Sequence, residues 1–173
     1  MKSTKAVEVI CQSLQGGGAV YVFGNGGSAA DAQHITGELV GRFLVERKPL
    51  KAFALVGNAS LTTCIGNDYG YEQIFSRQLE ALGAAGDVAM GLTTSGNSPN
   101  VLLALETARK LGMKSIVLTG QGGGKCAPLT DVLLDVPSLA TPRVQESHVV
   151  IYHTICQLVE QFFARKSPES SKP

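Results

Sequence analysis

The chain has 173 residues, the usual size of a single domain and enough to bury a hydrophobic core. Hydrophobic residues make up 44% and charged residues 17%, a balance that excludes an intrinsically disordered body. Lys and Arg number 15 against 14 Asp and Glu, which leaves a net charge of +1. This excludes the broad basic surface that non-specific nucleic-acid binding requires.

Cysteine spacing and apolar run lengths bear on the compartment. The four cysteines are far apart in the sequence and form no CxxC motif: Cys11, Cys64, Cys126 and Cys156. No signal peptide precedes them, a pattern that indicates a reducing compartment, the cytoplasm. The apolar runs are a few residues long, far short of the roughly 20 that a membrane-spanning helix needs. We therefore expect a cytoplasmic protein without a membrane segment.

In chain order, helical and strand-like segments alternate. Apolar spacing predicts a helix over residues 5–15, which the glycines at 16–18 end. Five apolar strands follow at 19–23, 52–56, 88–92, 115–119 and 132–136. Further helices are expected at 28–44, 59–65, 71–82, 98–111 and 142–164. This alternation predicts an α/β protein with a five-stranded parallel sheet in a three-layer sandwich, in the flavodoxin-like order 2-1-3-4-5.

The chain shows no sign of a second domain. We expect residues 1–164 to form one domain. The segment 165–173 is polar and bounded by proline, which predicts a disordered tail.

Two polar, glycine-containing loops follow strands of the expected sheet, where α/β proteins place their ligand sites. Residues 24–28 (GNGGS) follow the first strand and residues 93–98 (TTSGNS) follow the third. Free N–H groups at a helix start together with hydroxyl donors can bind an anion, although Ser and Asn there are also ordinary helix caps. Neither loop has the GxxxxGK[ST] or GxGxxG pattern of nucleotide-binding proteins. Two such loops at one sheet edge favour a phosphorylated polyol.

Ionisable residues on two expected helices could perform acid–base chemistry or bind a metal. Asp31, His34 and Glu38 are three and four residues apart, which places them on one helix face. The pattern suits a divalent metal or a carboxylate base beside a proton carrier, and it also suits a solvated helix face. On the last helix, ideal geometry makes Glu146 a partner for His153, which could equally be a buried core histidine.

In combination, these motifs resemble the sugar isomerase (SIS) family, and within it the phosphoheptose isomerase branch, over roughly residues 16–164. The matching segments in order are GNGGS (24–28) through His34 and Glu38, GRF (41–43), IGNDYG (65–70), GDV (86–88), TSGNS (94–98), LTG (118–120) and RVQESHVVIYH (143–153). The resemblance implies the SIS fold and an aldose–ketose isomerase.

The resemblance also assigns roles to individual residues. Zinc, one ion per subunit, would be held by His34, Glu38, Gln145 and His153. Glu38 and His153 would be the catalytic groups. The substrate and its phosphate would be bound by Asn25, Gly26, Gly27, Ser28, Arg42, Asp68, Thr93, Thr94, Ser95, Ser98 and Gln145. The family thus selects Gln145 where ideal helix geometry favours Glu146.

Two features depart from the family pattern. Pro142 stands where the family usually has an acidic residue, which leaves one sugar-hydroxyl contact without its usual residue. The chain also begins close to its first strand, whereas relatives carry a longer N-terminal helix that packs between subunits. The resemblance implies a homo-oligomer, a tetramer in the relatives, with sites at subunit junctions and no nucleic-acid or membrane partner.

The implied reaction converts D-sedoheptulose 7-phosphate to D-glycero-D-manno-heptose 7-phosphate through an enediol, the first step of bacterial heptose supply for lipopolysaccharide or another glycan. Moving one proton between carbons and another between oxygens needs two acid–base groups, which suits Glu38 and His153. One alternative is a non-catalytic SIS module that binds a partner protein, as do relatives that bind the bacterial replication initiator. Those relatives lack the Glu and His present here. Another alternative is an isomerase of a different phosphosugar.

Overall fold

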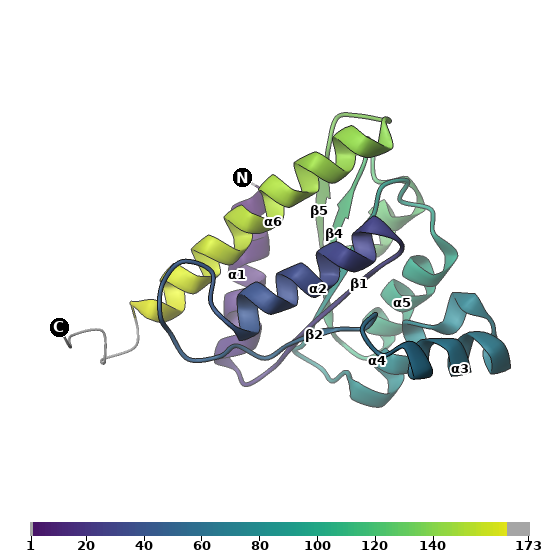
Figure 1. The fold of residues 1–173 in the computed structure, drawn as a ribbon, viewed down its shortest axis with the longest axis horizontal. Helices are drawn as coiled ribbons and strands as arrows, with labels where there is room; N and C mark the ends of the chain where they lie inside the picture. Colours follow the sequence, from purple (N-terminus) through teal and green to yellow (C-terminus); the bar gives the residue numbers. More distant parts are fainter. Residues whose placement is uncertain (1, 166–173) are drawn as a thin grey trace.

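A five-stranded parallel sheet forms the centre of the molecule in a computed structural model that describes residues 2–165 (Figure 1). Its strands are β1 (Val20–Gly24), β2 (Ala52–Ala54), β3 (Val88–Thr93), β4 (Lys114–Thr119) and β5 (Val132–Asp135). They are arranged in the order β2-β1-β3-β4-β5, and every neighbouring pair is parallel. The predicted α/β class and strand order are confirmed. Of the expected tail 165–173, only Arg165 lies within the described residues.

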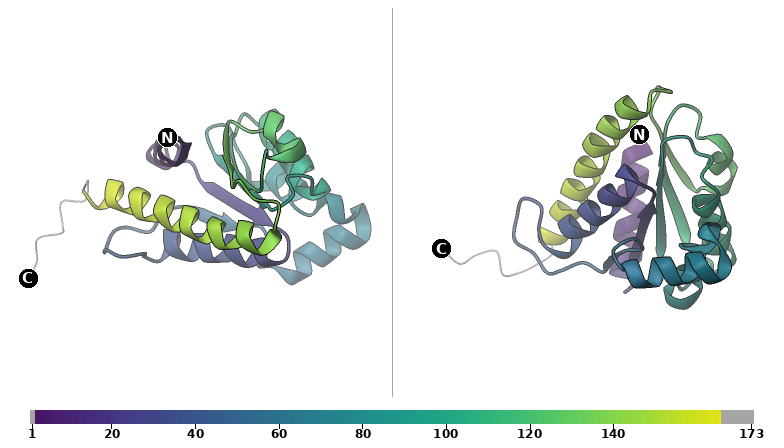
Figure 2. Two further views of the ribbon diagram at one scale, coloured as in Figure 1. Left: turned by 90° about the horizontal axis from the view of Figure 1, so that it is seen from above. Right: turned by 45° about the vertical axis from the view of Figure 1, so that its right-hand side comes forward.

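Helices cover both faces of the sheet, as the right-hand view of Figure 2 shows. One layer consists of α1 (Lys2–Gln15), α2 (Gly27–Val40) and α6 (Thr141–Ala164). The other side carries α3 (Ala59–Tyr69), α4 (Ser76–Leu82) and α5 (Pro99–Lys110), with the short 3-10 helices η1 (Tyr71–Gln73) and η2 (Gly124–Leu129). The three-layer arrangement places α2 beside α6, and the two helices are in direct contact.

Alternate residues of the strands fill two separate cores. Val20 and Val22 of β1 face the layer of α1, α2 and α6, whereas Tyr21 and Phe23 face the layer of α4 and α5. All five residues of β1 and all six of β3 are buried. Strands covered on both faces lack polar alternation, which is why they are continuous apolar runs in the sequence.

The second helix ends at Val40, so the expected extension to residue 44 is wrong. The buried carboxylate of Glu160 on α6 accepts hydrogen bonds from the backbone N–H groups of Phe43 (2.7 Å), Leu44 (2.6 Å) and Val45 (3.0 Å). Arg47 lies 3.7 Å from the same carboxylate and donates to the carbonyls of Glu38 and Gly41. These bonds hold residues 41–47 in a loop against α6 and satisfy carbonyls at the end of α2.

Two other helix boundaries also differ from expectation. The helix at 59–65 continues to Tyr69 and stops at Gly70, whose φ of +100° suits glycine. The expected helix 71–82 is divided into η1 and α4, because Ile74 and Phe75 between them turn into the core. The ring of Phe75 packs 5.3 Å from that of Phe23.

None of the helices between residues 2 and 165 combines the length and hydropathy that crossing a bilayer requires. Within the same residues, the cysteines form no disulfide bond.

Replacing the loop anchor, in the variant Glu160→Gln, should destabilise the fold. Glu160 is 1% exposed, and the change leaves the buried Arg47 guanidinium without its counter-charge. Because an uncompensated buried charge is costly, we expect the free energy of unfolding to fall by about 3 kcal/mol. Urea denaturation of the two proteins measures the difference.

The same anchor should make stability depend on pH. Burial alone raises the pKa of Glu160, but the N–H donors of residues 43–45 and the charge of Arg47 outweigh it and lower the pKa below 4.5. The carboxylate therefore stabilises the fold above the ordinary glutamate pKa, and this stabilisation is lost as the pH falls through the lowered value. Glu160→Gln should lose less stability than the wild type on acidification. Parallel stability curves would contradict this account.

Candidate active site

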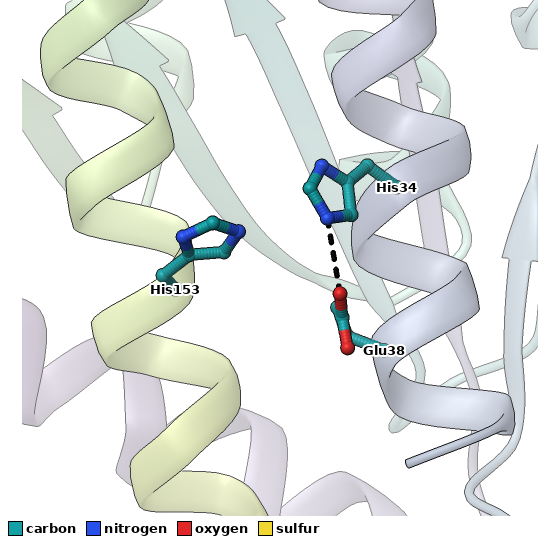
Figure 3. A group of neighbouring side chains, drawn as sticks. All are labelled: His34, Glu38 and His153. Atoms are coloured by element: carbon teal, nitrogen blue, oxygen red, sulfur yellow. Dashed lines mark hydrogen bonds and ion pairs between the residues drawn. The ribbon is translucent and has the colours of Figure 1, made fainter. Parts of the chain in front are cut away.

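Two histidines and a glutamate from different helices converge between α2 and α6 (Figure 3). His34 and Glu38 lie on successive turns of α2, and Nε2 of His34 is 3.0 Å from Oε1 of Glu38. His153 on α6 brings its ring to 5.1 Å from the ring of His34. His153 therefore joins two residues that lie 115 positions or more before it in the sequence, because α2 packs on α6.

The cluster fits a divalent cation. One ligand atom from each of His34, Glu38 and His153 can be chosen so that all three lie within 4.8 Å of one another. Nε2 of His153 is buried and has no hydrogen-bond partner among residues 2–165, which leaves a buried lone pair or N–H group to satisfy. Two imidazole nitrogens and a carboxylate form a donor set that suits zinc and leaves a coordination position open.

Aromatic side chains surround the cluster. Phe43 packs on His153 at a tilt with the ring centroids 5.3 Å apart, and the ring of Tyr152 lies edge-on to His34 at 5.4 Å. The hydroxyl of Tyr152 is 2.9 Å from Nδ1 of His34 and donates to Oδ1 of Asp31 at 3.4 Å. Burial, and then the charge of Asp31, raise the pKa of Tyr152 well above its ordinary range, so the phenol keeps its proton at neutral pH.

Tyr152 is a site residue that sequence reasoning missed. No spacing rule connects residue 152 with residue 34, and only the contact between α2 and α6 brings them together. The grouping of Asp31 with His34 on one helix face was the available signal. Asp31 and His34 do share that helix face, and the Tyr152 hydroxyl lies between their side chains.

Gln145 and Glu146 do not lie where ideal helix geometry predicts, which was with Glu146 as the partner of His153. Glu146 is exposed and pairs with Arg143 at 2.7 Å. Gln145 turns toward the start of α2, where its Nε2 lies 2.5 Å from the position that a Cβ on Gly27 would occupy. His153 is partly exposed, and the fully buried histidine is His148, whose Nε2 lies 3.2 Å from the carbonyl oxygen of Thr119. Burial lowers the pKa of His148, which suits a neutral core histidine.

The loop after β1 is joined to the start of α5 by side-chain amides. Asn25 and Asn100 exchange two hydrogen bonds, at 2.9 and 2.8 Å, and Tyr71 donates its hydroxyl to Asn25 at 3.1 Å. The Asn25 side chain therefore links the loop after β1 to the start of α5 and to η1. Asn100 is 2% exposed and was missed, because an asparagine in a helical first turn gives no signal of a distant partner.

The two predicted anion-binding loops lie side by side at the carboxyl edge of the sheet. A Cβ on Gly24 would come within 2.7 Å of the Leu92 carbonyl oxygen and 2.8 Å of the Ser28 side chain, so β1 and β3 need glycine to approach this closely. Gly26 and Gly27 are exposed, whereas Ser28 is buried. The loops thus present backbone and hydroxyl groups from both strands to one place.

Hydroxyl groups gather at the start of α5. The hydroxyl of Thr93 lies 3.0 Å from that of Ser98 and 3.4 Å from that of Ser95, and Thr94 is partly buried beside them. Ser98 occupies the N-cap position but makes no side-chain cap bond, and the N-cap Gly26 of α2 has no side chain to make one. The simple helix-cap interpretation therefore does not account for Ser98, and both helix starts can accept an anion.

Arg42 and Asp68 lie apart from this group within one chain. Arg42 is exposed after α2 and pairs with Glu46 at 3.6 Å. Asp68 on α3 accepts hydrogen bonds from Asn67 (2.7 Å) and Cys64 (3.6 Å). These partners are neighbours in sequence, and no hydrogen bond within residues 2–165 links Arg42 or Asp68 to the two loops.

The candidate site is open to solvent in a single chain. The His34 side chain is 46% exposed, although it belongs to the cluster. A cavity of about 470 Å³ lies instead at the amino ends of the strands, against Lys5, Ser13, Gly18 and Asp131. None of the predicted site residues lines that cavity. The chemistry of the side chains is therefore what marks the site.

Close packing of the Ser95–Asn97 turn against Gly123 and Gly124 should make Gly96 intolerant of substitution. Gly96 has a φ of +67°, and a Cβ there would lie 2.2 Å from the Gly123 carbonyl oxygen. We expect Gly96→Ala to lower the free energy of unfolding by the left-handed penalty of about 1–2 kcal/mol and by a further amount of about 1–3 kcal/mol from the clash.

Gly122→Ala is the matched control. Gly122 has a similar φ of +76°, but nothing lies within 4 Å of the position its Cβ would take. This variant should show only the backbone penalty in urea denaturation. Equal losses for the two variants would show that the close approach at Gly96 contributes nothing.

Comparison with known proteins gives consistent matches. A family model described as the SIS domain matches residues 2–120. A phosphoheptose isomerase of Helicobacter pylori (strain P12) is 50% identical over 163 residues, which are 94% of this chain and 85% of the relative. Solved phosphoheptose isomerases of Neisseria gonorrhoeae and Francisella tularensis are 44% and 42% identical, with TM-scores of 0.88 and 0.89. Each of these two alignments covers 92% of this chain and 85% of the solved chain.

Proposed function

Because the chain belongs to the phosphoheptose isomerase branch of the SIS-domain family, we infer that it is an aldose–ketose isomerase that converts D-sedoheptulose 7-phosphate to D-glycero-D-manno-heptose 7-phosphate. The observation that carries this inference from the chain itself is the convergence of Glu38 and His153 from two helices. A non-catalytic partner-binding module has no need of these two groups this close together. We further propose that the product supplies bacterial heptose for lipopolysaccharide or a related glycan.

The reaction needs two proton transfers, and two side chains are proposed to perform them. One proton leaves C1 of the ketose for the Glu38 carboxylate and returns to C2 of the enediol, which creates the new C–H bond of the aldose. The hydroxyl proton on O1 passes to O2 by way of the His153 imidazole, because an imidazole has one nitrogen that can accept a proton and one that can donate it. Glu38 and His153 are regenerated after each turnover.

A zinc ion, one per subunit, is proposed as the cofactor. His34, Glu38 and His153 would hold it, and Gln145 is proposed to complete the site and contact the sugar. Zinc would supply a Lewis acid that polarises the carbonyl group. Glu38 has two carboxylate oxygens, so it can serve as ligand and as base.

The terminal phosphate is proposed to bind at the carboxyl edge of the sheet. Its donors would be the hydroxyls of Thr93, Thr94, Ser95 and Ser98 and the uncapped start of α5. The sugar would lie toward residues 25–28 and the start of α2. Arg42 and Asp68 are proposed to contact the substrate from the surface of the chain, in addition to the neighbours that they pair with in this structure.

We also propose a homo-oligomer, a tetramer, whose assembly encloses the site, in the cytoplasm. Ile155 and Val159 on α6 are buried in this chain's own core, so they offer no apolar surface to a partner. Apolar side chains that are exposed near the site include Val150 (67% exposed), Leu158 (39%) and Leu44 (63%). Together with the half-exposed His34, they support a partner subunit over the site.

Glu38→Gln should abolish isomerisation and leave the fold intact. The change keeps the shape of the side chain but removes the basic carboxylate, and losing a general base lowers a rate about 10²–10⁴-fold. The assay incubates the protein with sedoheptulose 7-phosphate and follows the aldose by NMR, with deuterium uptake from solvent water as a second signal. Deuterium exchange at the wild-type rate would remove Glu38 from the role of carbon base.

The same assay distinguishes the alternatives. Failure of the wild-type protein to form aldose from sedoheptulose 7-phosphate, while isomerising another sugar phosphate, would establish a different substrate. Failure with every sugar phosphate, even with added zinc, would favour a binding module. Glu80→Gln, an exposed substitution on α4, is the matched control and should leave the rate unchanged.

Activity should depend on assembly. If the site is completed between subunits, specific activity should fall on dilution as the oligomer measured by light scattering dissociates. Because His34, Glu38 and His153 converge within one chain, mixing Glu38→Gln with His153→Ala subunits should not restore activity. A fully active monomer would refute the shared site, and restoration on mixing would contradict the single-chain cluster.

A further inference from the structure

Asp31, Tyr152 and His34 form a hydrogen-bonded chain behind the metal-binding cluster. Asp31 and His34 lie on the same face of α2, and Tyr152 reaches them from α6. The Tyr152 oxygen is 3.4 Å from Oδ1 of Asp31 and 2.9 Å from Nδ1 of His34. The other nitrogen of His34, Nε2, is the one that faces Glu38 at 3.0 Å.

When His34 is neutral, the three contacts of this chain share two protons, so the chain can run in either of two directions. A phenol has one proton, and an ionised carboxylate can only accept hydrogen bonds. If Tyr152 donates its proton to Asp31, its oxygen can contact Nδ1 of His34 favourably only as an acceptor. Nδ1 must then carry the imidazole proton, which leaves a lone pair on Nε2 at the face shared with Glu38 and His153.

We propose that Asp31 and Tyr152 are positioning residues that hold His34 in the tautomer protonated on Nδ1, so that Nε2 is ready to bind a metal ion. Tyr152 also fixes the ring orientation, because its own ring packs edge-on against His34 at 5.4 Å and against His153 at 4.9 Å. A partner on the outer nitrogen of a metal-binding histidine is the usual way in which proteins set ligand geometry and basicity. The inference deepens the proposed function and rests on its zinc site.

The opposite arrangement defines the competing outcome. Tyr152 could donate to Nδ1 of His34, and Nε2 could then donate to Glu38, so that the imidazole presents a proton to the cluster. In that arrangement Tyr152 has already donated its only proton to His34. No proton would then lie between Tyr152 and Asp31 unless the Asp31 carboxyl were protonated. Each neutral arrangement therefore leaves one contact without a proton: that of Tyr152 with Asp31 here, and that of Nε2 with Glu38 in the metal-ready tautomer. The Asp31 carboxylate favours the metal-ready tautomer, whose Nε2 lone pair is the one a metal ion needs, and its removal should release the imidazole from that tautomer.

The test uses two substitutions and one control. Tyr152→Phe removes the hydroxyl and keeps the ring that packs between the two histidines. Asp31→Asn keeps the shape, but its amide can donate as well as accept, so the direction of the chain is no longer imposed. Tyr21→Phe is the matched control, because Tyr21 loses one hydroxyl hydrogen bond, to the Leu82 carbonyl at 2.8 Å, on the opposite face of the sheet.

The first measurement is the tautomer of His34 in metal-free protein. Nitrogen-15 NMR of the imidazole, at a pH where free histidine is neutral, identifies which nitrogen carries the proton. We expect Nδ1–H in the wild type and in Tyr21→Phe, and a mixture of tautomers in Tyr152→Phe and Asp31→Asn. A wild-type protein with the proton on Nε2, or substituted proteins that keep Nδ1–H alone, would overturn the inference.

The second measurement is zinc affinity, by competition with a chelator. Loss of such an outer partner should weaken zinc binding about 10–100-fold in Tyr152→Phe, with Tyr21→Phe unchanged. Equal zinc affinity in Tyr152→Phe and Tyr21→Phe would also overturn the inference. If Tyr152→Phe does not fold, Asp31→Asn decides by the same two measurements. A wild type that binds no zinc would refute the proposed cofactor, and the tautomer alone would then decide the role of Asp31 and Tyr152.

Discussion

The site depends on a buried carboxylate that fixes α2 against α6. Glu160 holds the loop after α2 by three backbone hydrogen bonds, and Arg47 beside it binds the carbonyl oxygen of Glu38. His153 lies two turns before Glu160 on the same helix. The backbone of one catalytic candidate and the helix of the other are therefore joined by the same ion pair. A shift of α6 along α2 would separate the two histidines and break this anchor at the same time.

The second requirement is the close approach of β1 and β3. These strands are neighbours at the centre of the sheet, where the strand order reverses, and their following loops emerge together. Gly24 permits the contact, and Asn25 and Asn100 lock the two loops with paired amides. Gly27 and Ser28 of the proposed sugar-binding loop and the proposed base Glu38 then lie on the same helix, α2, the first two at its start and Glu38 in its last turn.

Features carried by local pattern were predictable from the sequence. Buried strands appear as continuous apolar runs, and the parallel order follows from their alternation with helices. The spacing of His34 and Glu38 placed both on one face, and they do lie 3.0 Å apart. The proposed substrate, the proposed zinc ligands and the choice of Gln145 over Glu146 were implied by the family resemblance. Spacing favoured Glu146, which the structure leaves paired with Arg143 in solvent.

Features fixed by distant partners were not predictable. The end of α2 at Val40 depends on Glu160, more than 110 residues away, because that carboxylate binds N–H groups that a longer helix would have used. Tyr152 and Asn100 acquire their partners only when the helices pack. Helical periodicity reports which face of a helix is buried, but it does not identify the residue on the other side.

The missing side-chain caps of α2 and α5 have a consequence for the ligand-free protein. A helix start without a side-chain cap typically forgoes about 1 kcal/mol, and two of them meet at the same edge of the sheet. The phosphate proposed to bind at the start of α5 would act as the missing cap of that helix. On that proposal the sugar phosphate would also stabilise the fold, because a ligand that binds only the folded state raises the free energy of unfolding.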